Sequence, residues 1–168
     1  MIERLCIIGV GLIGGSLARA LREAGACQEV VGAGRNVANL QTAVDLGVID
    51  RFETDLAAAV TGADMVVVCV PLGAMEEVFA RIKDQLEQHA VLTDAGSAKG
   101  SVVEAARHAF GHVPEFFVPG HPIAGTEQSG VEASFSSLYV DRRVILTPLP
   151  ETQVNATDRV REMWQAAG

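Results

Sequence analysis

The 168-residue sequence contains few cysteines, few basic residues and no long apolar run. Its three cysteines, at positions 6, 27 and 69, form no CxxC pair, so we expect a reducing, cytoplasmic location and no metal site. The 13 basic residues are scattered and are outnumbered by 21 acidic ones, which argues against binding to nucleic acid or an anionic membrane. No apolar stretch reaches the ~18 residues of a membrane span, and no cleavage site follows the first one, so we expect neither export nor a membrane anchor.

Strand and helix patterns alternate along the whole chain. This alternation predicts a Rossmann-type, doubly wound α/β fold with a mostly parallel sheet, and the length fits one domain over residues 1–168. Met65–Val70 is the most apolar of the strand candidates, so we expect it at the centre of the sheet, ended by Pro71. Strands are expected at residues 5–8, 29–32, 48–51, 65–70, 91–93, 116–118 and 144–147, and helices at 17–24, 37–46, 56–60, 75–86, 100–110 and 154–167.

A glycine-rich turn lies between the first strand and the first helix. Gly9 permits the tight turn, Gly11 lets a pyrophosphate approach the backbone, and Gly14 lets the helix pack closely on the strand. The helix N-terminus adds unpaired N–H groups that attract phosphate. The stretch predicts a dinucleotide site formed by Gly9, Gly11, Leu12, Ile13 and Gly14.

The end of the second strand indicates which dinucleotide binds. An NAD site carries an acidic residue about 20 residues beyond the third glycine, whereas an NADP site lacks that acid and has an arginine nearby. Here Gly34 stands at this position, followed by Arg35 and Asn36. We therefore expect NADP to be preferred over NAD, unless Arg35 is only a solvated turn residue. Val70 and Pro71, at the end of the fourth strand, are expected at the same crevice.

His121 is the strongest candidate for acid–base chemistry. It follows the sixth strand between Gly120 and Pro122, and an imidazole with an ordinary pKa of about 6.5 can take a hydroxyl proton near neutral pH. The alternative is a loop histidine that caps a backbone group, and the spacing alone does not choose between them. The other histidines, at positions 89, 108 and 112, lie near helix ends and are expected to be exposed or to cap those ends.

The loop after the fifth strand offers three further polar side chains. Ser97 fits an N-cap of the next helix and also a ligand contact. Lys99 could hold an anionic group or pair with Asp94. For Asp94 itself, we expect hydrogen bonds to the N–H groups of its own loop.

Three stretches together resemble the prephenate and arogenate dehydrogenases of tyrosine biosynthesis. They are Gly9–Ser16, Thr93–Gly100 with its GSxKG motif, and Pro119–Gly130 with its GHPxAGxExSG motif. The two later motifs are more specific than the glycine turn, because they occur in the expected order and on the expected strands. The resemblance covers essentially the whole chain.

This resemblance implies oxidative decarboxylation of prephenate to 4-hydroxyphenylpyruvate, or of arogenate to tyrosine, with NAD(P). His121 matches the family's catalytic histidine, which accepts the proton of the ring hydroxyl as a hydride leaves for the nicotinamide. Ser97 matches the serine that contacts the same hydroxyl and helps to align the nicotinamide, so it is a catalytic, cofactor and substrate candidate. Thr126 and Glu127 match positions that line the substrate entrance.

The sequence departs from the family pattern in two ways. Many members carry an acid where Gly34 stands, which again favours NADP here. Members also continue into an all-helical domain of roughly a hundred residues that completes a homodimer and supplies an arginine for the substrate carboxylates. We therefore expect residues 1–168 to be a fragment without that domain. Two alternatives stay open, namely another β-hydroxyacid-type dehydrogenase, against which residues 120–127 argue, and an NADP-binding module without turnover.

Overall fold

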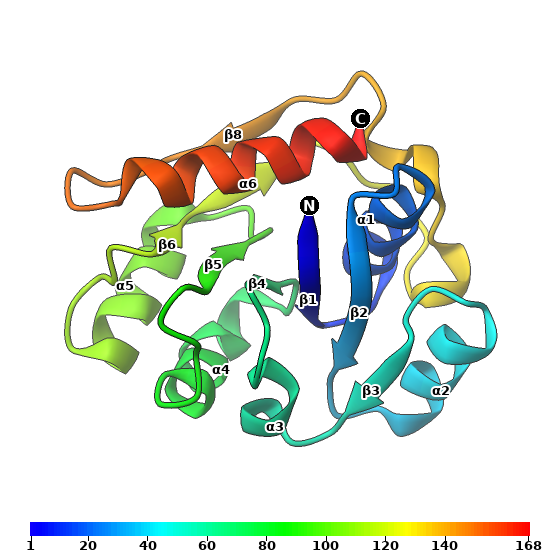
Figure 1. The fold of residues 1–168 in the computed structure, drawn as a ribbon, viewed down its shortest axis with the longest axis horizontal. Coiled ribbons are helices and arrows are strands. Elements are labelled where there is room, and N and C mark those ends of the chain that lie inside the picture. Colours follow the sequence, from blue (N-terminus) through cyan, green and yellow to red (C-terminus); the bar gives the residue numbers. More distant parts are fainter.

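Six parallel strands form the main sheet of the computed structural model, which describes all 168 residues (Figure 1). The strand order is β3-β2-β1-β4-β5-β6, which confirms a Rossmann-type parallel sheet with β4 beside β1 at its centre. Because the order reverses between β1 and β4, the carboxyl ends of these strands open a crevice. The strands are β1 (Ile2–Ile8), β2 (Cys27–Ala33), β3 (Arg51–Glu53), β4 (Met65–Val68), β5 (Val91–Asp94) and β6 (Phe117–Val118).

Helices cover both faces of this sheet, so the doubly wound arrangement is also confirmed. Successive residues of β1 point to opposite faces: Leu5 and Ile7 join one core, and Cys6 and Ile8 join the other. The first core is closed by α1 (Leu12–Glu23), α2 (Val37–Asp45) and α6 (Val154–Ala167). The second is closed by α3 (Leu56–Val60), α4 (Met75–Ile82) and α5 (Lys99–Phe110).

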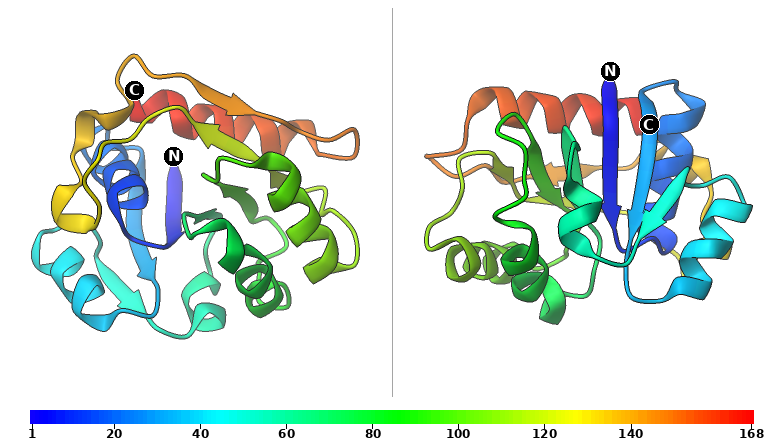
Figure 2. Two further views of the ribbon diagram at one scale, coloured as in Figure 1. Left: turned by 180° about the vertical axis from the view of Figure 1, so that it is seen from behind. Right: turned by 60° about the horizontal axis from the view of Figure 1, so that its bottom comes forward.

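The prediction for the last strand was wrong in one respect. β8 (Val144–Leu146) lies outside the main sheet and pairs antiparallel with β7 (Gly120–Pro122), a strand that the sequence did not reveal. β7 has only three residues and contains both glycine and proline, which are depleted in strands. Pro119, just before it, has no N–H with which to continue the ladder of β6. Figures 1 and 2 show β8 running alongside α6.

Several predicted boundaries shift by a few residues. β3 begins at Arg51 rather than at Val48, because its pairing with β2 starts at Arg51 opposite Val31. Just before it, the Asp50 carboxylate accepts the N–H of Val30 at 2.7 Å. β4 ends at Val68, two residues earlier than expected, and α4 ends at Ile82 rather than at residue 86. The chain between β7 and β8 forms two 3-10 helices, η2 (Val131–Ala133) and η3 (Ser136–Tyr139), and a third one, η1 (Leu72–Ala74), precedes α4.

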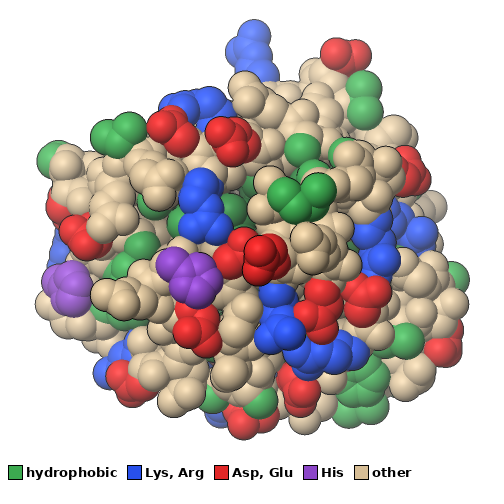
Figure 3. Space-filling view, in the orientation of Figure 1, with side chains coloured by type: hydrophobic (Ala, Val, Ile, Leu, Met, Phe, Trp, Pro, Cys, Tyr) green, Lys and Arg blue, Asp and Glu red, His purple; other side chains and the backbone are tan.

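The surface carries charges of both signs. On the face shown in Figure 3, acidic and basic side chains are interspersed, which fits the net charge of −8 and the absence of a basic stripe in the sequence. None of the helices combines the length and the apolar character that a membrane span requires.

Candidate functional site

The turn between β1 and α1 explains where glycine is required. Gly9 has φ +93°, and a Cβ there would lie 2.6 Å from the carbonyl oxygen of Cys69. A Cβ at Gly14 would lie 2.5 Å from the carbonyl oxygen of Gly9, so any larger residue forces helix and turn apart. At Gly11, by contrast, a Cβ would meet nothing within 4 Å, and the space above this residue is open to a ligand.

The first turn of α1 keeps its N–H groups available. Gly11 is the N-cap and offers no side-chain hydrogen bond, and the first turn contains no acidic residue. Such a helix end carries partial positive charge and suits a phosphate. The backbone of this first helical turn is fixed by a hydrogen bond, in which the Tyr139 hydroxyl donates to the carbonyl of Ile13 at 2.6 Å. The Asn39 amide secures the glycine turn by donating to the carbonyl of Val10 at 2.8 Å.

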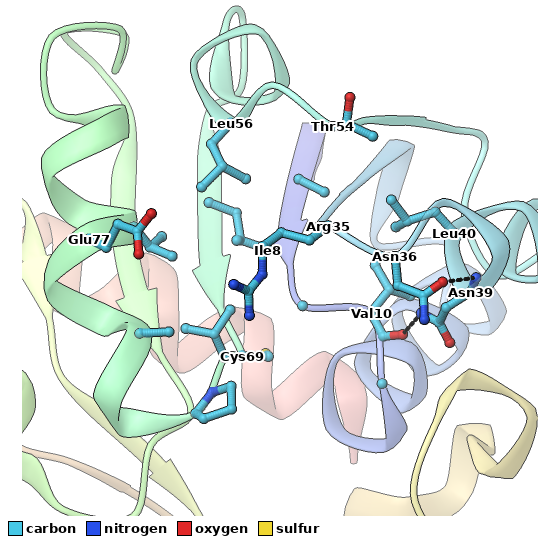
Figure 4. Close-up of a pocket in the computed structure, with 18 of the residues that line it drawn as sticks. Ile8, Val10, Arg35, Asn36, Asn39, Leu40, Thr54, Leu56, Cys69 and Glu77 are labelled. Carbon is cyan, nitrogen blue, oxygen red and sulfur yellow. Dashed lines mark hydrogen bonds between the residues drawn. The ribbon is translucent and has the colours of Figure 1, made fainter.

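A cavity of about 440 Å³ lies beyond the carboxyl ends of β1, β2 and β4 (Figure 4). This volume falls within the range of small-molecule sites. Seven of the predicted cofactor residues line it: Gly9, Gly11, Gly34, Arg35, Asn36, Val70 and Pro71. The other predicted residues lie outside its lining, with Leu12, Ile13 and Gly14 in the first turn of α1, and Ser97, His121, Thr126 and Glu127 in later loops and in β7.

At the end of β2, the cavity contains a positively charged side chain that has no partner. Arg35 points into the cavity and forms no hydrogen bond or ion pair (Figure 4). A Cβ at Gly34 would meet only the methyl groups of Leu40, at 4.0 Å, so the missing carboxylate is not excluded by lack of room. Asn36 serves as the N-cap of α2, where its side chain accepts the N–H of Asn39 at 3.0 Å.

The sequence did not identify the residues that line the cavity opposite Arg35. Glu77 is the one acidic residue that lines the cavity, and it pairs with Arg81 of the same helix, α4, at 2.8 Å. Asn39, Thr54 and Leu56 also belong to the lining. The position of α4 could have been predicted, because the helix that follows β4, the strand at which the strand order reverses, borders the crevice.

Asp94 and Lys99 form a buried ion pair that joins two loops. Asp94 is fully buried, and its carboxylate accepts the N–H of Gly96 at 2.8 Å and that of Gly120 at 3.1 Å. Lys99 donates to Asp94 and to the carbonyl of Gly120, the latter at 2.5 Å. The expected loop-ordering role of Asp94 is therefore confirmed, and of the two readings of Lys99 the structure selects the pair with Asp94.

Burial dominates the ionisation of this pair. It raises the pKa of Asp94 above its usual range, although Lys99 and the two backbone N–H groups act in the opposite direction. It likewise lowers the pKa of Lys99, against the attraction of the carboxylate. Each ion therefore depends on the other to remain charged inside the protein.

The candidate catalytic side chains lie at the strand ends that this pair connects. Ser97 is exposed, and of the two roles left open for it the helix cap is not observed, because Ala98 is the N-cap of α5 and no side chain bonds there. His121 is half-buried in β7 opposite Ile145, and its imidazole has no hydrogen-bond partner, which gives no support to a capping role. Thr126 and Glu127 are exposed, and the Thr126 hydroxyl accepts the N–H of Gln128 at 3.1 Å.

The remaining titratable groups near the site do not form a second reactive centre. His89, His108 and His112 are exposed, as predicted. Cys69 lines the cavity, but burial raises the pKa of its thiol to about 12, so it is neutral and a poor nucleophile. No group of three His, Cys, Asp or Glu side chains is arranged to hold a metal ion.

The strand order, the glycine turn and the open helix end define a Rossmann-type nucleotide-binding domain, and the residues present fit a dinucleotide. Residues 17–168 match the family described as the nucleotide-binding domain of prephenate dehydrogenase. The chain belongs to this family.

Relatives of known sequence and structure agree with this assignment. The chain is 36% identical to the cyclohexadienyl dehydrogenase of Zymomonas mobilis, over 99% of this chain and 56% of that protein. It matches prephenate dehydrogenase from A. aeolicus, solved in complex with hydroxyphenyl propionate and NAD+, with a TM-score of 0.91 and 35% identity, covering 100% of this chain and 58% of that one. Arogenate dehydrogenase from Synechocystis matches with a TM-score of 0.88 and 27% identity, over 99% of this chain and 57% of that one. The chain thus spans somewhat more than half the length of these relatives.

Proposed function

We propose that this chain is the cofactor-binding part, with the proton-accepting histidine, of an enzyme that oxidises and decarboxylates prephenate or arogenate with NAD(P)+. The observation that carries the proposal is the link from Asp94 and Lys99 to Gly120, the residue before His121. This link supports the proposal because it joins the loop that carries Ser97 to the residue before His121. Family membership supports the reaction class, and the NAD+ in the A. aeolicus structure supports a nicotinamide cofactor.

The chemistry assigns each residue a defined task. The oxidised nicotinamide, when bound, accepts the hydride that leaves the ring carbon. His121 takes the proton of the hydroxyl on that carbon, and Ser97 hydrogen-bonds the same hydroxyl and fixes its direction. Loss of the ring carboxylate as CO2 returns an electron pair to the ring oxygen, which recovers the proton from His121. The ring becomes aromatic, so the step is effectively irreversible.

For the cofactor, we propose that NADP+ binds more tightly than NAD+. Arg35 is unpaired in the cavity and Gly34 offers no carboxylate, so a 2′-phosphate gains a charge-assisted contact of about 1–3 kcal/mol. Titration calorimetry should show Kd values about 5- to 150-fold apart. Gly34→Asp should shift the preference towards NAD+, while the neutral control Gly34→Asn should not reverse it. Tighter binding of NAD+ by the unaltered chain would contradict this assignment.

The whole reaction needs more of the protein than the cofactor site. We propose that an arginine in the part of the protein that corresponds to the uncovered region of the relatives holds one of the substrate carboxylates. Residues 1–168 should then gain thermal stability with NADP+ yet form no NADPH from prephenate or arogenate, because positioning worth about 7–11 kcal/mol is lacking. Steady turnover by residues 1–168 alone would contradict this division of the site.

A joined protein tests the function directly. In it, this chain is followed by the C-terminal part of the Zymomonas mobilis enzyme, which the chain does not cover. We expect NADPH formation from at least one of the two substrates, followed by absorbance. A joined protein that folds and binds NADP+ but oxidises neither compound would refute the proposed reaction and favour a nucleotide-binding module without turnover.

A further inference from the structure

The ribbon formed by β7 and β8 has two chemically different faces. Residues that lie directly opposite each other in an antiparallel pair share a face. Gly120 opposes Leu146 and Pro122 opposes Val144. Val144 and Leu146 pack against the core that α6 closes, so this is the inner face of the ribbon. In the rear view of Figure 2, β8 (orange) lies in front of α6 (red).

The opposite face, here called the outer face, gathers four side chains. His121 opposes Ile145, and one step along the ribbon the N–H of Ile123 donates to the carbonyl of Arg143 at 2.8 Å. Ile123 and Arg143 therefore lie on the same face as His121. Ile123 is 45% exposed and Ile145 is 47% exposed, which is unusual for two neighbouring isoleucines.

Arg143 is an unpaired cation on this face. It is exposed and takes part in no ion pair or side-chain hydrogen bond in the structure. Side chains alternate between the two faces along the chain, so its neighbour Arg142 lies on the same side as Val144 and Leu146. Arg142 lines a separate cavity beside Trp164. The chain thus places one arginine beside His121 and one behind the ribbon.

We propose that the outer face of the β7–β8 ribbon is a substrate platform, on which Arg143 binds a carboxylate of an anionic cyclic hydroxy acid. This inference rests on the proposed function, since it assigns the hydroxyl of that molecule to His121. Ile123 and Ile145 supply an apolar surface for the ring. Arg143 is the diagonal neighbour of His121, and diagonal neighbours in an antiparallel pair are about 7–8 Å apart, which a six-membered ring with opposed polar substituents can span.

The experiment uses the 168-residue chain with NADP+ and isotope-labelled isoleucine methyl groups. Two probes are titrated and followed by NMR: 4-hydroxyphenylpropionate, which carries a carboxylate, and 4-ethylphenol, which lacks one. We expect both probes to shift the methyl signals of Ile123 and Ile145, and to leave those of the core residues Ile2 and Ile49 unchanged. Arg143→Gln should weaken binding of the carboxylate probe about tenfold and leave the phenol unaffected. The matched control Arg142→Gln should change neither affinity.

Each outcome bears on the platform. The proposal would be overturned if Arg143→Gln and the unaltered chain bind the carboxylate probe equally well, or if Arg142→Gln loses the same affinity. It would also be overturned if the methyl signals of Ile123 and Ile145 do not shift. Its failure is separable from failure of the proposed function. If the joined protein turns over its substrate with a KM unchanged by Arg143→Gln, the platform fails and the function stands. If the probe binds through Arg143 but the joined protein oxidises neither substrate, the platform stands and the function fails.

Discussion

Replacing His121 with asparagine should lower kcat of the joined protein by about 10²–10⁴-fold and leave its Kd for NADP+ within about twofold. Asparagine keeps a planar polar side chain of similar size, but it cannot take up the hydroxyl proton. Cofactor binding is expected to persist because His121 lies in β7, outside the lining of the nucleotide cavity. The loss should therefore fall on the chemical step.

Two measurements separate this effect from a general loss of structure. Steady-state NADPH formation gives kcat, and calorimetry of the same preparation gives the Kd for NADP+. His108→Asn is the matched control, since His108 is an exposed histidine of α5 whose ion-pair partners are Glu76 and Glu104, and it should retain full activity. If His121→Asn retains activity within a few-fold, His121 has a structural role and the proton acceptor must be sought elsewhere.

Much of the cofactor site could be read from the sequence because its requirements are local. Gly9, Gly11 and Gly14 follow a buried strand directly, and each has in the structure the steric situation that its place in the motif implies. The parallel sheet was equally accessible, because buried strands such as β4 appear as continuous apolar runs. Arg35 could be placed at the crevice because the carboxyl end of β2 must lie there.

What the sequence did not reveal depends on contacts between distant segments. β7 and β8 are separated by more than twenty residues, and neither sequence contains a pattern that indicates pairing with the other. The sequence left open whether Lys99 binds a ligand or pairs with Asp94 for the same reason. The answer depends on the burial of Asp94 and on the position of Gly120, which lies in the connection after the next strand. Ser97 resembled an N-cap because α5 begins just after it, and only the backbone geometry places the cap at Ala98.

Replacing Lys99 with methionine should lower the free energy of unfolding by about 3–5 kcal/mol at neutral pH. Methionine preserves most of the apolar stem, but the fully buried carboxylate of Asp94 loses its counter-ion, and Gly120 loses a donor to its carbonyl. The lost stability then reflects an unpaired buried charge rather than a cavity.

The pH dependence of this variant identifies the charge responsible. Burial already raises the pKa of Asp94, and removal of Lys99 raises it further, so the folded variant binds a proton more tightly than its unfolded chain. A raised pKa contributes stability below the unfolded value, and that contribution is lost as the pH rises through the folded value. Urea unfolding should therefore show a larger deficit relative to the unaltered chain at about pH 8 than at about pH 5.5. Adding Asp94→Asn to Lys99→Met removes the charge and should abolish this difference between the two pH values. A deficit that is the same at both would show that Asp94 is not the unpaired group, and the link between the Ser97 loop and His121 would then need another explanation.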